Sequence, residues 1–128
     1  MKQTDLIKRY REIEIQTSSP AKLILLLYDE AIKSLTLAKK EIKMNNIEKT
    51  HELLLKTQKI IRELMCSLDL EVGKIAINWY KLYEYIYRRL VQANFEKNLK
   101  ILEEVLELLR PLREAWVKMM GGVNESNN

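Results

Sequence analysis

The sequence predicts an all-α fold, an antiparallel four-helix bundle with a short N-terminal cap segment. Apolar residues return every three or four positions over four long segments, which is the spacing of one face of a helix. The chain has 3 glycines and 2 prolines among 128 residues, and so few helix breakers favour long helices joined by short turns. Short joints make consecutive helices antiparallel.

The first helix is expected to begin at Ser19 and Pro20 and to end at residues 44–46. Ser19 suits the N-cap position, where its hydroxyl accepts a backbone hydrogen bond. Pro20 suits the first helical position, because its missing N–H would have no partner there. The stripe expected to face the core consists of Ile24, Tyr28, Ala31, Leu35, Ala38 and Ile42.

The second helix is expected to follow directly and to end at the joint of residues 69–73. Asn45, with Glu48 three residues later, forms an asparagine version of a capping box. In that motif the two side chains satisfy backbone N–H groups at the start of a helix. The stripe expected on this helix consists of Ile47, His51, Leu54, Gln58, Ile61, Met65 and Leu68.

The third helix is expected over residues 74–94 and the fourth over residues 97–120. Gly121 and Gly122 are a helix-ending signal. Pro111 lies inside the fourth helix and predicts a kink, because proline removes a hydrogen bond and clashes with the preceding turn. The main stripe of the fourth helix consists of Leu102, Leu106, Leu109, Arg113 and Trp116.

The expected domain organisation has three parts: a cap segment at 1–17, a bundle at 18–122 and a disordered tail at 123–128. The cap segment has an apolar face at helical spacing, but a helix this short is marginal alone. We therefore expect it to dock on apolar surface of the bundle. Its apolar residues are Leu6, Ile7, Tyr10 and Ile13.

The third helix has more apolar surface than a bundle helix needs. Its two neighbouring apolar stripes cover about half the circumference, whereas an arc a little over 100° is typical. The second helix has a smaller extra arc. Surplus apolar surface marks a partner site if it is exposed, or a wide core if it is buried, and the pattern leaves both readings open. The candidate partner-binding residues are Leu53, Ile60, Leu64, Ala76, Tyr80, Tyr83, Tyr87 and Val91.

The sequence predicts no enzyme, no metal and no cofactor. His51 is the only histidine, so the Glu-x-x-His spacing that begins at Glu48 cannot be completed to a di-iron site. Cys66 is the only cysteine, which excludes an internal disulfide and a CxxC pair. Three glycines, two of them adjacent near the end of the chain, form no phosphate-binding loop.

The charge and hydropathy patterns favour a cytoplasmic protein that binds no nucleic acid and does not insert into a membrane. The net charge is +4, and the basic residues alternate with glutamates along helical segments, which is typical of solvated helix faces. The longest apolar run, residues 23–28, is too short to span a bilayer. The first residues lead into no signal-peptide pattern.

Several stretches of the chain resemble the FliS family, the flagellar export chaperones for flagellin. The order and spacing of these stretches carry the resemblance, because no single one is a diagnostic motif. They are Tyr10, residues 17–24 (TSSPAKLI), residues 27–32 (LYDEAI), residues 64–69 (LMCSLD), residues 75–90 (IAINWYKLYEYIYRRL) and residues 109–116 (LRPLREAW). Gly73 and Lys74 depart from the two glycines that many members have at this joint.

The resemblance implies a four-helix bundle that binds the disordered C-terminal segment of flagellin. It also implies that the chaperone prevents premature flagellin polymerisation and delivers flagellin to the gate of the flagellar type III export apparatus. Members are thought to cover their groove with the N-terminal segment when flagellin is absent. The alternative function is a self-associating helical adaptor that binds another helical protein, and a weak homodimer stays open.

Overall fold

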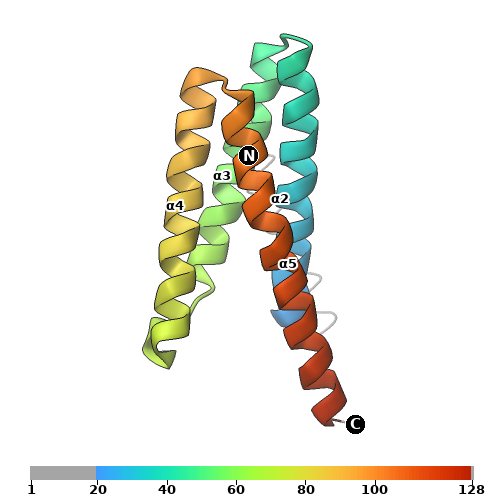
Figure 1. The fold of residues 1–128 in the computed structure, drawn as a ribbon, viewed down its shortest axis with the longest axis vertical. Helices are drawn as coiled ribbons and strands as arrows, with labels where there is room; N and C mark the ends of the chain where they lie inside the picture. Colours follow the sequence, from blue (N-terminus) through green and yellow to red (C-terminus); the bar gives the residue numbers. More distant parts are fainter. Residues whose placement is uncertain (1–19, 128) are drawn as a thin grey trace.

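The computed structural model describes residues 20–127. The elements, in chain order, are α2 (Pro20–Lys43), α3 (Ile47–Cys66), the 3₁₀ turn η1 (Leu70–Val72), α4 (Lys74–Glu96) and α5 (Leu99–Asn127). These residues contain no strand, and the helices pack against one another as Figure 1 shows. The predicted all-α four-helix bundle is confirmed for this part of the chain.

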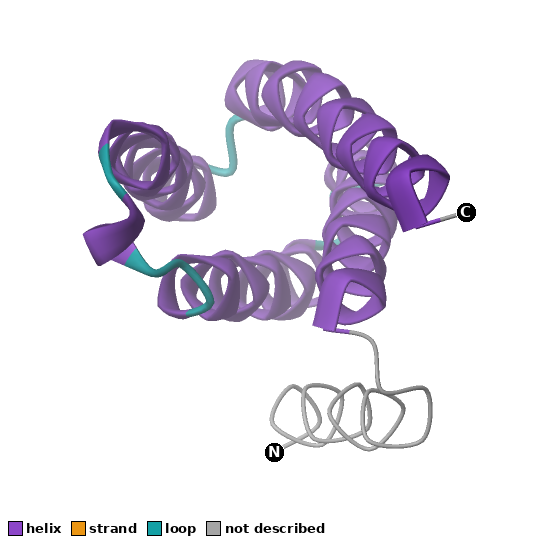
Figure 2. Cartoon of the chain, turned by 90° about the horizontal axis from the view of Figure 1, so that it is seen from below, coloured by secondary structure: helices purple, strands orange, loops and turns teal. Residues whose placement is uncertain are grey.

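The four helices form a ring around the core. α2 packs on α3, α3 on α4 and α4 on α5, and α5 returns to α2, so the ring closes (Figure 2). The joints between the helix pairs are short, which makes sequential neighbours antiparallel. α2 and α4 therefore lie diagonally opposite each other, as do α3 and α5.

The joint between α2 and α3 differs from the predicted capping box. Asn45 has a left-handed backbone, with φ of 59°, and its N–H donates to the carbonyl oxygen of Ile42 over 3.1 Å. Asn45 therefore ends α2, a role that suits asparagine because it tolerates this conformation. Asn46 is the N-cap of α3, and its amide donates to Glu41 over 3.0 Å instead of capping the helix. The capping-box prediction is wrong.

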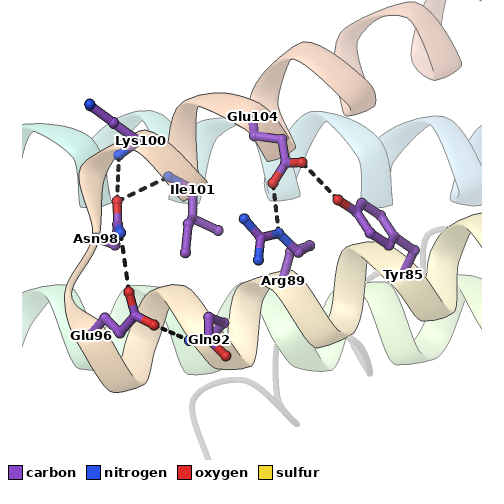
Figure 3. A network of polar contacts seen from close by, with 8 residues as sticks. All are labelled: Tyr85, Arg89, Gln92, Glu96, Asn98, Lys100, Ile101 and Glu104. Atoms are coloured by element: carbon purple, nitrogen blue, oxygen red, sulfur yellow. Dashed lines mark hydrogen bonds and ion pairs between the residues drawn. The ribbon is translucent and has the colours of Figure 1, made fainter.

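The joint between α4 and α5 lies at the same end of the bundle (Figure 1) and holds these two helices close together (Figure 3). The Oδ1 atom of Asn98 accepts hydrogen bonds from the backbone N–H groups of Lys100 (2.9 Å) and Ile101 (3.3 Å), which caps the start of α5. Farther along, the Glu104 carboxylate of α5 accepts a hydrogen bond from the Tyr85 hydroxyl and one from Arg89 Nε, both at 2.8 Å. These contacts fix one end of the α4–α5 pair.

The hydrogen bonds at Glu104 also settle its charge. The Arg89 guanidinium and then the Tyr85 hydroxyl lower the pKa of the Glu104 carboxyl, because both donate to the ionised form. Glu104 is therefore an anion at neutral pH and accepts from both groups at once. Two donors on α4 and one acceptor on α5 therefore hold these helices together, and we call this end of the bundle the closed end.

α5 continues past the pair of glycines at which the sequence predicts its end. The helix runs through Pro111, Gly121 and Gly122 to Asn127. A glycine costs a helix interior only about 1 kcal/mol relative to alanine and does not forbid helical dihedrals. The predicted end of the helix is therefore wrong, and residues 123–127 belong to α5.

The core is built from all four helices, and on α3 and α4 it is wider than the predicted main stripes. On α3 the buried face includes Leu53, Ile60 and Leu64, whereas Ile47 and His51 are exposed. On α4 the buried face centres on Tyr83 and includes the following residues: Ile86, Leu90 and Ala93. Ile75, an apolar residue in the first turn of this helix, is 74% exposed. The core therefore takes residues from both stripes of each helix.

Candidate partner-binding groove

An apolar groove of about 760 Å³ lies at the end of the bundle opposite the closed end. α4 and α5 meet at the joint of residues 97–98 and diverge toward this end, as Figure 1 shows. We call it the α4–α5 groove. Its apolar lining residues are Ala21, Leu23, Ile24, Leu68, Ile75, Ala76, Trp79, Tyr83, Trp116 and Met119.

Two tryptophans face each other in the α4–α5 groove. The Trp79 and Trp116 ring centroids are 6.5 Å apart in an edge-to-face arrangement. Trp116 Nε1 donates to the carbonyl oxygen of Ala21 over 3.1 Å, which fixes the α5 wall on the first turn of α2. Trp79 packs in turn on Tyr83, with ring centroids 6.0 Å apart. The groove therefore has aromatic walls that pack on one another.

A buried pair of tyrosines lies beneath the groove, and of the two only Tyr83 lines it. The hydroxyl groups of Tyr28 and Tyr83 are hydrogen-bonded to each other, and their ring centroids are 6.3 Å apart. Burial raises the pKa of Tyr83 to about 12 and also raises the pKa of Tyr28, since a phenolate would be poorly solvated there. Both hydroxyls are therefore neutral at physiological pH.

The rim of the groove adds a few polar groups to an apolar interior. Asp69 and Lys74 lie at the mouth, and Asp69 Oδ1 accepts the backbone N–H of Glu71 over 3.1 Å. Ile75, also in the lining, is mostly exposed to solvent. An apolar concave surface with a polar rim is suited to the apolar face of a partner helix or extended segment.

The eight predicted partner-binding residues do not form one surface in the described structure. Ala76 and Tyr83 line the α4–α5 groove. Three α3 residues are buried in the core of the bundle: Leu53, Ile60 and Leu64. The others lie on α4 and do not line that groove: Tyr80, Tyr87 and Val91. Their role in binding a partner stays a prediction.

Tyr87 and Val91 differ in their surroundings. Tyr87 is half-buried, its hydroxyl accepts a hydrogen bond from Arg62 Nη2 over 2.6 Å, and the guanidinium of Arg62 lies 5.3 Å from the ring centroid. Val91 is 44% exposed and lines a shallow depression of about 460 Å³ between α3 and α4. Tyr87 therefore contacts Arg62 of α3, whereas Val91 is exposed at the surface.

Phe95 adds a large apolar side chain to this depression, because it is 88% exposed. We call the surface the Phe95 patch; its residues are His51, Leu55, Gln58, Val91, Asn94, Phe95 and Lys97. His51 Nδ1 and Asn94 Oδ1 are 3.1 Å apart, so the only histidine of the chain contacts an amide. The Oε1 atom of Gln58 is buried and has no hydrogen-bond partner among the described residues.

Most of the residues that line the α4–α5 groove are not among the predicted partner-binding residues, including Trp116, Met119, Leu68 and Ile24. One signal could have found the two tryptophans. Trp79 lies near the start of the third helix and Trp116 near the end of the fourth, and antiparallel neighbours bring those ends together. Phe95 gave no such signal, because an isolated aromatic residue near a joint is equally consistent with burial.

The described residues provide no site for a metal ion and no membrane span. No group of three or more histidine, cysteine or acidic side chains comes together within residues 20–127. No helix in that range is long and apolar enough to cross a bilayer. Cys66 is a free, exposed thiol.

The sequence matches the family described as "Flagellar protein FliS" over residues 3–123. A protein named flagellar secretion chaperone FliS from Bacillus subtilis is 35% identical over 107 residues, which cover 84% of this chain and 80% of that protein. The protein of that name from Salmonella typhimurium is 36% identical over 116 residues, or 86% of each chain. Its namesake from Vibrio cholerae is 30% identical over 115 residues, or 86% and 85% of the two chains.

Proposed function

Because the chain belongs to the FliS family of flagellar secretion chaperones, we propose that it binds the C-terminal segment of flagellin in the α4–α5 groove. FliS is a family of chaperones and not of enzymes. The observation that carries the proposal is the apolar groove itself, which is open to solvent, lined by two tryptophans and walled by the exposed Ile75. Apolar surface of this kind favours a protein partner.

Flagellin bound in this way cannot polymerise early. Its C-terminal segment is disordered before assembly, as the family resemblance implies, and becomes helical where it lies in the groove. A segment whose apolar face is covered by the bundle is unable to pack against other flagellin subunits. The complex then carries flagellin through the cytoplasm to the flagellar type III export apparatus.

The Phe95 patch extends the proposed binding surface. Ile75 and Phe95 are twenty residues apart on α4, which corresponds to about 30 Å along a helix. A long flagellin segment reaches both surfaces at once if about ten of its residues are extended, at about 3.3 Å each. Val91 and Phe95 then supply apolar contacts at the far end of the same partner.

Binding of the C-terminal segment of flagellin is expected to give a clearly negative heat-capacity change. Apolar surface leaves water on both partners, and a disordered segment buries more of its own surface as it folds. Isothermal titration calorimetry at several temperatures measures this quantity. The control is dilution of the protein into buffer, which reveals self-association through the groove. A heat-capacity change near zero, or a segment that stays disordered by NMR in the complex, would sink the proposal.

We also propose that the cap segment, residues 1–17, covers part of the groove until flagellin arrives. The segment lies outside the described residues, but the first turn of α2 supports the proposal, because Ala21 and Leu23 line the groove. Three or four half-buried apolar side chains contribute about 1 kcal/mol each. That gain offsets part of an ordering cost of about 1–2 kcal/mol per residue. The cap is therefore held weakly and exchanges with a partner.

Deletion of residues 1–15 is expected to tighten flagellin binding or to speed its association several-fold, because a competitor for the groove is removed. Stopped-flow fluorescence of the two tryptophans measures the association rate, and circular dichroism checks that the bundle stays folded. If the deletion instead weakens binding several-fold without unfolding the bundle, the segment contacts flagellin directly and the cap proposal is wrong.

A further inference from the structure

Tyr28 and Tyr83 join diagonally opposite helices beneath the α4–α5 groove. Tyr28 belongs to α2 and Tyr83 to α4, and their hydroxyl groups form a hydrogen bond to each other. Tyr28 is fully buried and Tyr83 is 2% exposed. Tyr83 lines the groove, whereas Tyr28 does not. The pair thus has one member in the core and one at the floor of the groove.

The hydroxyl groups of Tyr28 and Tyr83 have two protons, and the hydrogen bond between them needs only one. Among residues 20–127, neither hydroxyl has a second hydrogen-bond partner. A buried donor without an acceptor is costly, so the second proton favours any acceptor that reaches it.

We propose that the Tyr83 hydroxyl donates this second hydrogen bond to a neutral carbonyl oxygen of the segment bound in the groove. The inference rests on the proposed function, because it assigns a contact to the same occupant. Tyr83 is the donor because it borders the groove, and Tyr28 then donates to the Tyr83 oxygen. Tyr83 thereby favours bound segments that place a carbonyl oxygen within reach of its hydroxyl.

The surroundings specify the kind of oxygen. The groove walls beside Tyr83 are apolar, with Trp79 and Ala76 next to it on α4, and a carboxylate placed there would lose its hydration. The acceptor is therefore an amide carbonyl, from the main chain or from an asparagine or glutamine side chain. Carbonyls in the middle of a helix are already hydrogen-bonded, whereas those of its last turn are free. The occupant accordingly has an extended stretch, a helix end or an amide side chain above Tyr83.

Two isosteric substitutions separate this role from a structural one. Tyr83→Phe and Tyr28→Phe each remove the hydroxyl pair, so both free proteins are expected to melt at similarly lowered temperatures. Only Tyr83→Phe removes the donor to the occupant. We expect it to weaken binding of the flagellin C-terminal peptide about tenfold, which corresponds to about 1.4 kcal/mol. Tyr28→Phe leaves the Tyr83 proton free, and its affinity is expected to stay within about twofold of wild type.

Calorimetry on both variants and the wild type gives the three affinities. Equal losses in the two variants, or wild-type affinity in Tyr83→Phe, would overturn the inference while leaving flagellin binding in place. Absence of binding by the wild type contradicts the proposed function itself and removes this contact with it. If Tyr83→Phe fails to fold, the ¹³Cζ resonance of Tyr83 in the wild type decides: it shifts when the peptide binds, and an unchanged resonance rejects the donor.

Discussion

Replacing Tyr83 with glutamate is expected to destabilise the bundle by more than about 4 kcal/mol, enough to unfold much of the population. The Tyr83 side chain is 2% exposed and packs against the rings of Tyr28 and Trp79. A carboxylate at this position would be buried without a cationic partner, and the Tyr28 hydroxyl would lose its hydrogen bond. Denaturant unfolding followed by circular dichroism measures the loss.

Tyr80→Glu is the matched control for this prediction. Tyr80 lies one turn earlier on the same helix and is also a predicted partner-binding residue, but it is only half-buried. Its replacement is expected to change the free energy of unfolding by about 1 kcal/mol or less. If Tyr83→Glu unfolds at the same denaturant concentration as Tyr80→Glu, Tyr83 does not belong to the core and its placement here is wrong.

Replacing Ile75 with glutamate is expected to weaken binding of the flagellin C-terminal peptide at least tenfold, with little change in stability. Ile75 lines the α4–α5 groove and is 74% exposed in the free protein. The substitution therefore costs the folded bundle little, but it places a charge against the apolar face of the bound segment. Leaving a charge desolvated and unpaired in an interface costs several kcal/mol. Calorimetry measures the affinity, and a thermal melt checks the fold.

Ile77→Glu provides the comparison for Ile75→Glu. Ile77 is an exposed isoleucine on the same first turns of α4, but it does not line the groove. The two variants have the same charge change and a similar position on the helix, so non-specific effects of the charge are shared. Wild-type affinity is expected for Ile77→Glu. Equal losses in the two variants would mean that the α4–α5 groove is not the binding surface.

The number and order of the helices follow from local pattern, and the sequence predicts them well. Pro20 begins α2, and the apolar spacing from Ile24 to Ile42 continues through the helix that the structure contains. The third and fourth helices fall within two residues of their predicted starts, at Lys74 and Leu99. These features depend on neighbours three or four positions apart, and such spacing is visible in a single sequence.

The helix ends at the joints are harder to predict, because one residue type can suit several positions and the apolar spacing does not show which position it takes. Asn45 suits both the start of one helix and the left-handed end of another, and the structure uses it for the end. Gly121 and Gly122 suit a helix end but cost a continuing helix little, and α5 continues. A single residue type therefore predicted a boundary correctly only where, as at Pro20, one role was allowed.

The candidate site depends on the distances between the helices. The apolar stripe of a helix predicts which face is buried but not how far away the neighbouring helix lies. Leu64 and Tyr80 both belong to surplus apolar arcs, yet one is fully buried and the other half-buried. The α4–α5 groove exists because the contacts at Glu104 hold one end of the pair, while α4 and α5 diverge at the other (Figure 1). That geometry joins residues about forty positions apart, so the sequence predicted surplus apolar surface but not its place.

The indole N–H resonances of the two tryptophans test the central claim most directly. Trp79 and Trp116 are the only tryptophans in the chain, and both line the α4–α5 groove. In a ¹H–¹⁵N spectrum of the labelled protein, both indole signals are expected to shift when the flagellin C-terminal peptide is added. The fraction of protein bound that these shifts give at each peptide concentration is expected to match the fraction that calorimetry gives. A peptide that binds by calorimetry while both indole signals stay in place would contradict binding in this groove.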